Sequence, residues 1–382
     1  MKKSLFSLAL GTFTLGMTEF VMMGILPDVA ADLHVSIPVA GHLISAYAIG
    51  VCTGAFSLVF MHKYRPKHIL YFLTSLILFG AVLCSVASSY WLLLCARFIG
   101  GLPHGAFFGV GSIVAVKLAK EGKGTSAVSL MCAGMTVANL CGIPVDTFLS
   151  THFSWRIPFM IVAVSAVTTL VCIHRWVPNI EALPNHGMKA QFRFLKNLDP
   201  WLIILATMFG NGGIFCWYSY IAPLLQKEGG FNGTEVSALM IIAGLGMVLG
   251  NLISGKVCER IKPGKVASIL QYLAALSLLA VFFCAQWGGV TVVLMFIICG
   301  CLFGVSSPQQ FLILKHAKGG EMLGGCTIQV AFNLGNALGA LAGGLPISMG
   351  LGYNYPALVG VPIVLVGACC LLLFHKKYER AI

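Results

Sequence analysis

Four ionisable side chains interrupt long apolar runs of the sequence: Glu19, His42, Arg97 and Asp146. Placing a charge in hydrocarbon is costly, so an ionisable residue inside such a run is a candidate for proton or ion binding. A carboxyl group can do this chemistry if both its charged and its neutral forms are accessible. Burial favours the neutral form and a nearby guanidinium favours the charged form, and the sequence alone leaves open which effect is larger at Glu19.

The depths of Glu19 and Arg97 within their runs are similar. Glu19 lies eight residues before Pro27, which is about 12 Å along a helix, and Arg97 lies six residues after Trp91, about 9 Å from the same end. We therefore expect both side chains in one layer. Glu19 then either carries an exchangeable proton or is a structural carboxylate held by Arg97 or by backbone donors. For Arg97 we expect a structural or coupling role rather than direct contact with a ligand.

His42 and Asp146 lie nearer the ends of their apolar runs than Glu19 does. Polar side chains at such positions usually reach water, so we expect both to be helix-end groups. Asp146 is nevertheless the second candidate for an exchangeable proton, because it is the other acidic residue within an apolar run of the first half of the chain.

Further polar and aromatic side chains could line a water-filled cavity: Met17, His104, Asn139, Asn211, Trp217, Tyr218, Tyr220, Asn333 and Asn336. His104 follows a proline and is either a satisfied interior histidine or a hydrogen-bonding group of the cavity. Glycines surround Asn211 and could loosen the helix there, whereas close helix packing with an interfacial belt of aromatic residues is the alternative. Asn139 and Asn336 stand among small residues, and we expect them mainly to pack helices together.

The elements that carry these residues are predicted by composition. Of 382 residues, 58% are hydrophobic and 9% are charged, against about a quarter charged in soluble domains. This excludes a soluble enzyme, a disordered protein and a nucleic-acid-binding domain. A membrane-spanning helix needs about 20 apolar residues, and we expect an all-α integral membrane protein with twelve such helices. Their predicted ranges are 5–27, 38–60, 68–88, 91–116, 126–149, 156–177, 200–225, 234–256, 266–286, 290–314, 323–349 and 354–374.

The net charge of +12 is distributed according to this topology. With the amino terminus in the cytoplasm, every Lys and Arg falls on the cytoplasmic side except Arg97, inside a span, and Arg156 and Lys227, on the other side. Basic connections resist translocation, so both termini are expected in the cytoplasm. The first apolar run has no small-residue cleavage site, and we expect it to remain as a span rather than to be a removed signal peptide.

The chain repeats itself at an offset of 197 residues, which places 62–66 on 259–263 and 138–142 on 335–339. We therefore predict two six-helix halves in parallel orientation, with a path for a small molecule at their interface near the bilayer midplane. Residues 188–198 form either an amphipathic surface helix or an unstructured connection. The predicted divisions are an N-terminal half at 1–177, a cytoplasmic linker at 178–199 and a C-terminal half at 200–382.

Several runs resemble motifs of the major facilitator superfamily, and the resemblance covers essentially the whole chain. The connection at 58–67 keeps the basic character of the family's loop between its second and third helices, and 255–260 is closer to that pattern. Arg97 matches the arginine of the family's fourth helix, and 134–142 is similar to the antiporter motif with Asn139 in place of its proline. The runs that resemble the arabinose-efflux-permease-like (AraJ-like) branch of the drug:proton antiporters are 16–20, 103–111 and 331–339.

The resemblance implies a secondary active transporter of the bacterial inner membrane. It would export a small sugar-like or drug-like molecule by alternating access, driven by a proton gradient and without a cofactor. The proton-coupling residues would be Glu19, Arg97 and Asp146, with Glu19 carrying the proton. The basic connections form a cytoplasmic gate with acidic partners or else provide topological charge alone, and the gate residues would be Lys63, Arg65, Lys67, Glu259 and Arg260. A proton-coupled uptake symporter and a non-transporting membrane sensor are the alternatives.

Other chemistry has little support in the sequence. The run 250–256 resembles a phosphate-binding loop, but Val257 stands where Ser or Thr is needed and the run ends a span. No G-x-S-x-G, H-E-x-x-H or C-x-x-C pattern occurs, which argues against an enzyme, a zinc site and disulfides. The expected partners are a small-molecule substrate, protons and the lipid bilayer, with no nucleic acid, and the protein is expected to be a monomer.

Overall fold

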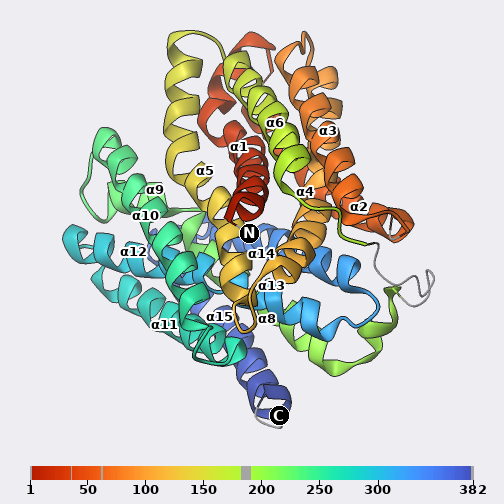
Figure 1. The fold of residues 1–382 in the computed structure, drawn as a ribbon. Coiled ribbons are helices and arrows are strands. Elements are labelled where there is room, and N and C mark those ends of the chain that lie inside the picture. The colour runs from red at the N-terminus through yellow and green to blue at the C-terminus, as the bar shows by residue number, and fades with distance from the viewer. Residues whose placement is uncertain (1, 36, 62, 182–190, 380–382) are drawn as a thin grey trace. The chain divides into compact units, whose positions relative to one another are not determined.

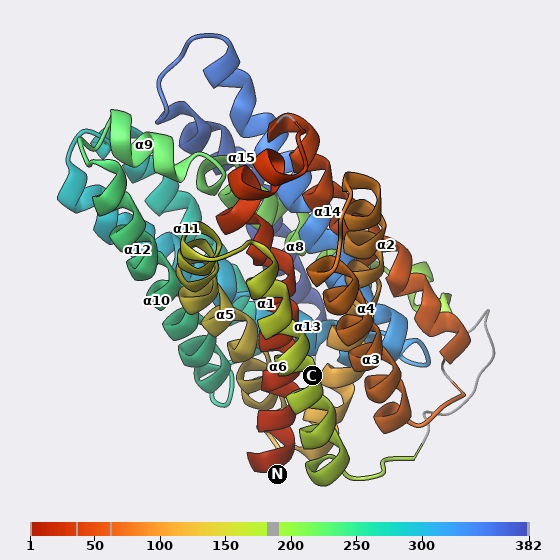
Figure 2. The same cartoon turned by 90° about the horizontal axis from the view of Figure 1, so that it is seen from above.

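The computed structural model describes residues 2–35, 37–61, 63–181 and 191–379, which form helices joined by short connections (Figures 1 and 2). No strand occurs in these ranges. The prediction of an all-α protein is confirmed. In chain order the elements are α1 (Lys2–Asp32), α2 (Ile37–Met61), α3 (Pro66–Ser85), α4 (Tyr90–Leu118), α5 (Gly124–His152), α6 (Arg156–Trp176), η1 (Arg193–Lys196), α8 (Leu198–Tyr218), α9 (Ile221–Lys227), α10 (Gly233–Val257), α11 (Pro263–Cys284), α12 (Gly288–Gly304), α13 (Ser306–His316), α14 (Glu321–Ser348), α15 (Tyr355–Phe374) and η2 (His375–Glu379).

Eleven helical stretches in the described part of the chain are long and apolar enough to cross a membrane. The remaining predicted span, 38–60, corresponds to α2, which contains a shorter apolar stretch, His42–Ala55. Two spans are each built from two helices. The span predicted at 200–225 consists of α8 and α9, and the span predicted at 290–314 consists of α12 and α13. The short helix considered at 188–198 begins outside the described residues, and its described part forms the η1 turn.

Contacts between Cα atoms divide the chain into two compact units. Each unit includes one short segment from the other half of the sequence: unit 1 includes Ala317–Val330, and unit 2 includes Glu121–Ser129. These segments lie about 197 residues apart, which is the offset of the sequence repeat. Because the units do not follow the predicted boundary exactly, the division at 178–199 stays a prediction. Unit 1 consists of Met1–Lys120, Leu130–Phe194 and Ala317–Val330, and unit 2 consists of Glu121–Ser129, Leu195–His316 and Ala331–Ile382.

In unit 1, both α2 and α3 pack against α4. Helices α2 and α4 reach backbone contact because glycines face the partner helix. A Cβ at Gly54 would lie 1.8 Å from a carbonyl oxygen of α4, and one at Gly101 would lie 2.2 Å from the carbonyl oxygen of Tyr47. Small residues permit such close approach of membrane helices. The contact fixes the faces of α2 and α4 that carry Tyr47, Arg97 and His104.

In unit 2, glycines of α8 meet both α14 and α15. A Cβ at Gly339 would lie 2.1 Å from the carbonyl oxygen of Gly212, and one at Gly213 would lie 2.6 Å from that of Gly360. Helix α8 is continuous through this run. The glycines beside Asn211 therefore serve close helix packing, which was the alternative to a loosened helix.

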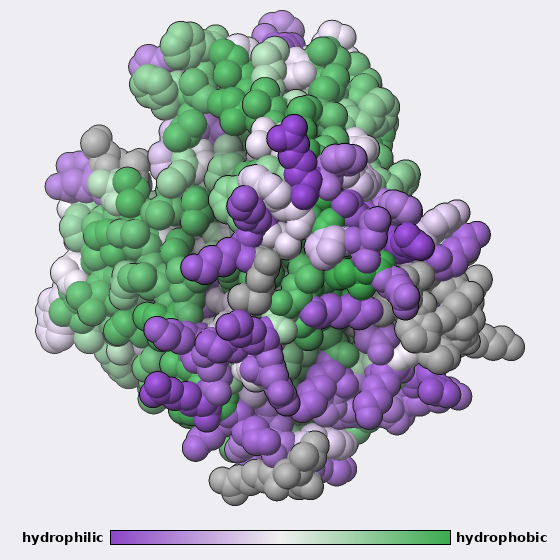
Figure 3. Space-filling model, viewed as in Figure 1, coloured by the Kyte–Doolittle hydropathy of each residue, from purple (hydrophilic) through white to green (hydrophobic). Residues whose placement is uncertain are grey.

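Large hydrophobic side chains are exposed along the helices, among them Ile253, Leu276, Phe283 and Leu341. Figure 3 shows broad, continuous hydrophobic areas on one face, with hydrophilic side chains gathered together elsewhere on it. Exposed apolar areas of this extent mark a surface that contacts a membrane or another protein. Together with the long apolar helices, they identify a multi-pass membrane protein.

Candidate functional site

Arg97 lies in the interior of unit 1 and holds three helices together. Only 1% of the residue is exposed. Its Nε donates to the carbonyl oxygen of Leu43 on α2 at 3.3 Å, and its Nη1 donates to that of Thr18 on α1. The guanidinium carbon lies 4.5 Å from the ring centre of Tyr47. A guanidinium suits this place because it is planar, keeps its charge and stacks on aromatic rings. The contacts agree with a structural role for Arg97.

Glu19, on α1, is the carboxyl of the same region, with 13% of its side chain exposed. Its Oε2 atom has no hydrogen-bond partner among the described residues and lies 3.9 Å from Nε2 of His104 on α4. This distance exceeds that of a hydrogen bond. Among the described residues, no ion pair joins Glu19 to Arg97, so Arg97 does not hold the carboxylate in place.

His104 is fully buried and lies between Glu19 and Tyr47. Its Nδ1 lies 2.9 Å from the hydroxyl of Tyr47, and its ring stacks on Phe108 with centroids 5.3 Å apart. The side chain of Gln329 is a further neighbour. These contacts fix the imidazole and leave its Nε2 near Glu19. We call Glu19, Tyr47, Arg97 and His104 the α1–α4 cluster.

Tyr47 is a member of this cluster that the sequence did not single out. A lone tyrosine in an apolar run has no spacing that distinguishes it from a packing residue. A signal was nevertheless present, because Tyr47, Gly50 and Gly54 follow one another at helical spacing and share one face of α2. That face is the one that packs against α4.

Asp146, on α5, is buried, and neither of its carboxyl oxygens has a partner in the described part of the chain. Helix α5 continues to His152, so Asp146 lies within the helix rather than at its end. A Cβ at Gly142 would lie 2.6 Å from the sulfur of Met17 and 3.9 Å from an oxygen of Asp146, so these residues are neighbours. The prediction that Asp146 faces water is wrong, whereas His42 is exposed as expected.

The predicted cavity residues of α8 fall into two groups. Asn211 and Trp217 are buried, and neither the amide atoms of Asn211 nor Nε1 of Trp217 has a partner among the described residues. Tyr218 is partly buried, with its ring centre 5.6 Å from that of Phe215. Tyr220 follows α8 and donates to a carbonyl oxygen of α14 at 2.9 Å. Asn211 and Trp217 thus have unused hydrogen-bonding atoms, whereas the Tyr220 hydroxyl is already bonded to α14.

The asparagines of the repeat, Asn139 and Asn336, are both partly buried. Nδ2 of Asn139 and Oδ1 of Asn336 have no hydrogen-bond partner in the described ranges. Next to Asn336, a Cβ at Gly335 would lie 2.3 Å from a carbonyl oxygen of α8, which agrees with the expected packing role. Asn333 is partly buried on the same helix, α14.

The acidic gate residue, Glu259, contacts the start of α5 within unit 2. Nζ of Lys123 lies 3.3 Å from its Oε2, and the hydroxyl of Ser126 donates to its Oε1 at 2.6 Å. The Ser126 hydroxyl and then the Lys123 ammonium hold the pKa of Glu259 below its ordinary value. Arg260 is exposed beside it. The acidic partner expected for the basic connection at 63–67 is thus engaged by Lys123.

The three basic gate residues of unit 1 differ in their contacts. Lys63 and Arg65 are exposed, and Arg65 immediately precedes α3. Nζ of Lys67 donates to the carbonyl oxygen of His174, in the last turn of α6, at 2.9 Å. A cation is favourable at the carboxyl end of a helix. Lys67 therefore ties the start of α3 to the end of α6.

Asn251 is a second buried polar centre that the sequence did not identify as such. Its Nδ2 donates to the carbonyl oxygen of Ser129 at 2.9 Å, and the Ser129 hydroxyl donates to the carbonyl oxygen of Asn251 at 2.6 Å. The hydroxyl of Ser307 bonds to Oδ1 of Asn251. We call these three residues the Asn251 network. It joins α10 to the start of α5 and to α13. The glycines that imitate a phosphate-binding loop around Asn251 serve this helix contact, since a Cβ at Gly255 would lie 2.3 Å from Cβ of Ser129.

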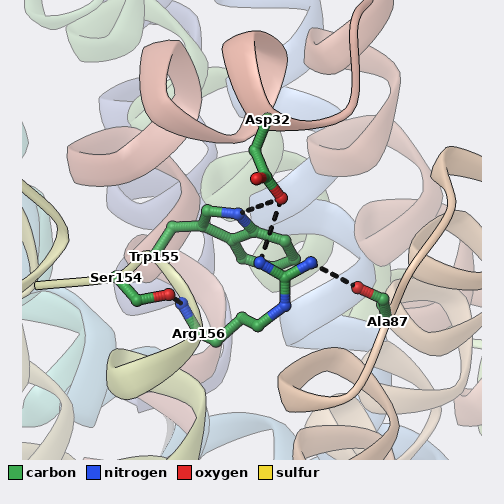
Figure 4. Close-up of polar contacts among 5 residues, drawn as sticks. All are labelled: Asp32, Ala87, Ser154, Trp155 and Arg156. Carbon is green, nitrogen blue, oxygen red and sulfur yellow. Dashed lines mark hydrogen bonds and ion pairs between the residues drawn. The ribbon is translucent and has the colours of Figure 1, made fainter.

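A further set of polar contacts, all of them with partners, lies at the carboxyl end of α1 (Figure 4). Nε1 of Trp155 and Nη1 of Arg156 both donate to Oδ2 of Asp32 at 3.0 Å, and Nη2 of Arg156 donates to the carbonyl oxygen of Ala87 at 2.9 Å. The indole hydrogen bond, followed by the contacts of Arg156, lowers the pKa of Asp32. Asp32, Trp155 and Arg156 therefore tie the end of α1 to the start of α6 and to the connection before α4.

The described residues offer no cluster of three or more His, Cys, Asp or Glu side chains that could hold a metal ion. The cysteines, most of them buried or partly buried in helices, are free thiols.

Comparison with known proteins assigns this arrangement of helices to a family. Residues 8–325 match a family model described as Major Facilitator Superfamily. The "Putative transporter AraJ" of Escherichia coli (strain K12) is 46% identical over 381 residues, covering 100% of this chain and 96% of that protein. The "Inner membrane transport protein YdhP" of the same strain is 36% identical over 378 residues, covering 98% and 96%.

A more distant relative and a solved structure extend the comparison. The "Chloramphenicol resistance protein" of Streptomyces lividans is 25% identical over 343 residues, covering 88% of this chain and 87% of that protein. The crystal structure of the Escherichia coli fucose:proton symporter FucP superposes with a TM-score of 0.77 at 15% identity and covers 97% of this chain and 98% of that one. At this identity the likeness concerns the fold alone.

Proposed function

Since the chain belongs to the Major Facilitator Superfamily, in its AraJ-like branch, we propose that it is a proton-coupled secondary transporter that exports a small molecule by alternating access. That it is a membrane transporter and not an enzyme follows from the family and from its relatives. Proton coupling, the export direction and the roles of individual residues are the parts that we propose.

The observation that carries the proposal is the free Oε2 atom of Glu19, buried 3.9 Å from Nε2 of His104. A carboxylate with a structural task is normally paired or hydrogen-bonded, because an unpaired buried charge is unfavourable. Here the neighbouring guanidinium, Arg97, donates through Nε and Nη1 to backbone carbonyls of α2 and α1, and no ion pair joins it to Glu19 among the described residues. Glu19 is therefore free to gain and lose a proton without the loss of a native contact.

In the proposed mechanism, the protonation state of Glu19 selects between two conformations. The charged form favours bound substrate, and the neutral form favours the reoriented empty cavity. His104, fixed by Tyr47 and Phe108, accepts or returns the proton when a small movement or a water molecule bridges the gap to Glu19. Arg97 keeps the three helices in register throughout. Asp146, buried without partners, is proposed as a second proton-binding group.

The proposed substrate is a small drug-like or sugar-like molecule. The family branch and the name of the Streptomyces lividans relative support export. Within unit 2, the aromatic side chains of Trp217 and Tyr218 provide apolar contact, and the amide of Asn211, which has no partner among the described residues, provides unused hydrogen bonds. Such a mixture of mostly apolar surface with a few polar groups is typical of small-molecule sites.

The proposed orientation follows from the distribution of basic residues. Both termini and the connection at 178–199 lie in the cytoplasm of a bacterial cell, and the protein is a monomer of the inner membrane. The contact of Glu259 with Lys123 and Ser126 is proposed to form part of the cytoplasmic gate, together with Arg260 and the basic residues Lys63, Arg65 and Lys67. This contact would form and break during each transport cycle.

The test is proton flux in sealed proteoliposomes. Purified protein is reconstituted with a pH-sensitive dye inside, and a panel of compounds that includes chloramphenicol and arabinose is screened for compound-dependent proton movement. We expect at least one compound to drive proton release, and Glu19→Gln to reduce this flux to the level of empty liposomes while the protein remains folded.

Glu121→Gln is the matched control, because Glu121 is an exposed carboxylate in the connection before α5. It should transport like the wild-type protein. Wild-type flux with an unchanged pH dependence in Glu19→Gln would refute the assignment of the coupling proton to Glu19. The same experiment on Asp146→Asn would then decide whether that residue takes the role. Substrate flux in the absence of any proton movement would refute proton coupling itself.

A further inference from the structure

An apolar groove runs along the outside of unit 2 between α10 and α11. Its volume is about 320 Å³, near the lower end of the roughly 300–1,000 Å³ range of small-ligand sites. The walls include Ile253 from α10 and Ile269 and Leu273 from α11, all of which are exposed. Almost the entire lining is hydrocarbon. The groove therefore fits an aliphatic chain better than a polar solute.

The groove exists because α10 and α11 both pack on α12 and make little contact with each other. Its floor contains Gly250 of α10 and Gly300 and Cys301 of α12. A Cβ at Gly250 would lie 2.0 Å from the carbonyl oxygen of Gly300, so the two backbones are in contact there. The glycines therefore let α10 and α12 approach closely beneath the groove.

Exposed basic residues lie next in the chain to one end of the groove. Val257 and Ile261 line that end, and the exposed residues next to them in the chain are Lys256, Arg260 and Lys262, followed by Lys265 in the first turn of α11. The acidic residue of this connection, Glu259, is engaged by Lys123 and Ser126. Within the part of the chain that the structure describes, no ion pair is formed by Arg260, Lys262 or Lys265.

We propose that this groove binds one anionic phospholipid, with an acyl chain between α10 and α11 and the phosphate against the basic residues of the α10–α11 connection. An anionic lipid complements both parts of the site, because its chain replaces bilayer contact along the apolar walls and its phosphate offers oxygen acceptors to ammonium and guanidinium donors. A zwitterionic lipid would fill the groove but gain less from the cations. A free phosphate would meet the cations but leave the groove empty.

A lipid bound in this groove would change the electrostatic environment of the proposed gate residue Glu259. The same connection carries Glu259, whose contacts with Lys123 and Ser126 join α10 to the start of α5. A phosphate held by Lys262 and Lys265 reduces the net positive charge around Glu259. The inference concerns lipid binding by unit 2 and stands whether or not the protein couples transport to protons.

Native mass spectrometry of the full-length protein tests the proposal. The detergent-solubilised protein is titrated with an equimolar mixture of dioleoyl phosphatidylglycerol and dioleoyl phosphatidylcholine. We expect the first lipid retained to be phosphatidylglycerol. The double variant Lys262→Gln/Lys265→Gln should weaken its binding by roughly fivefold for each charge removed.

The matched control is Lys315→Gln/Lys318→Gln, which removes an exposed lysine of the last turn of α13 and one of the connection to α14 and should leave the retained lipid unchanged. Ile269→Trp, which fills the groove without a change in charge, should weaken both lipids. Glycerol 3-phosphate, which has the headgroup charge without the chains, should not displace the lipid. Equal retention of the two lipids, or an equal loss in both lysine pairs, would overturn the proposal in favour of general charge attraction. Displacement by glycerol 3-phosphate, or unchanged lipid binding in Ile269→Trp, would show that the groove is not used.

Discussion

The α1–α4 cluster and the Asn251 network are both buried polar centres among membrane-spanning helices, yet their hydrogen bonds differ. Around Asn251, the side-chain amide donor, the amide oxygen and the neighbouring serine hydroxyls all have partners. In the α1–α4 cluster, neither Oε2 of Glu19 nor Nη2 of Arg97 has a partner among the described residues. Completed networks hold one conformation. Free donors and acceptors remain available for a proton, a water molecule or a substrate.

We infer from this difference that the hydrogen-bonded polar groups stabilise the fold and that the unbonded ones take part in transport. Within the α1–α4 cluster, Arg97 is an exception, since it satisfies backbone carbonyls of two other helices while it stacks on Tyr47. The comparison therefore predicts that side chains with completed contacts control unfolding, whereas Glu19, Asn211 and His104 control flux. Four substitutions can break or sharpen this distinction.

The largest effect on stability is expected for Arg97→Ala. The substitution removes the side-chain hydrogen bonds to two buried helix carbonyl oxygens and leaves a cavity beside Tyr47, which together should cost roughly 3 kcal/mol or more. Thermal unfolding of the purified protein in detergent measures the loss. The exposed Arg175→Ala, in the last turn of α6, is the control and should unfold like the wild-type protein. Equal stability of the two variants would contradict the role of Arg97 as a link between helices.

A smaller loss is expected for Asn251→Ala, with Asn211→Ala as its matched comparison. Both asparagines are buried in membrane-spanning helices, but Asn251 loses hydrogen bonds to Ser129 and Ser307, whereas the Asn211 side chain makes none with the residues that the structure describes. We expect a cost of about 1–3 kcal/mol for Asn251→Ala and little change for Asn211→Ala in thermal unfolding. Asn211→Ala should instead reduce substrate-driven flux. Similar unfolding in the two variants would remove the distinction between completed and free polar groups.

Tyr47→Phe should act mainly on the protonation of the α1–α4 cluster. It removes the hydroxyl next to Nδ1 of His104 but keeps the ring beneath Arg97. The expected cost in stability is about 1 kcal/mol, and the pH midpoint of proton flux in proteoliposomes should move. Tyr272→Phe, whose hydroxyl only makes a long contact with the sulfur of Cys369 at 3.5 Å, is the control. An unchanged pH profile in Tyr47→Phe would show that His104 takes no part in coupling.

The smallest effect is expected for Asp32→Asn, in the contacts that Figure 4 shows. The Asp32 side chain is 46% exposed, so its pairing with Arg156 should contribute less than about 1 kcal/mol. Because folding lowers the pKa of Asp32, this contribution is complete above the unfolded value of about 3.9 and is lost as the pH falls through the folded-state pKa. Unfolding measured against pH should therefore show wild type and variant converge in acid. Glu181→Gln, an exposed change, should show no such convergence with the wild type.

Composition and the length of the apolar runs were enough to place most helices, because the requirement for about 20 apolar residues per span acts on each segment separately. The same local reasoning missed the breaks at Ser219 and Val305, where single spans divide into α8 and α9 and into α12 and α13. It also placed Asp146 in water, because distance from a predicted helix end is a poor measure of burial when the end itself is uncertain by a turn. Here α5 continues beyond Asp146 to His152.

The candidate site was only partly predictable for a related reason. Glu19, Arg97 and His104 are conspicuous in apolar runs, but their partners are not. Arg97 bonds to backbone carbonyls, which every residue has, and Tyr47 is unremarkable in an apolar sequence. Asn251 lies in the segment 250–256, which resembles a phosphate-binding loop, and nothing in the sequence indicated its hydrogen bonds. Sequence identifies unusual residue types, whereas contacts made by backbone atoms or by common side chains leave no distinctive pattern.

The sequence by itself determined that this protein is an all-helical membrane transporter of its family and which ionisable groups interrupt its apolar runs. These properties depend on residue type and order along single segments. The tertiary structure decided which polar groups are satisfied: that Arg97 serves the backbone rather than Glu19, that Glu19 lies near His104, and that Glu259 bonds to Lys123 and Ser126. Hydrogen bonds need atoms within about 3 Å and in suitable directions, and helices far apart in sequence meet that condition only after they have packed.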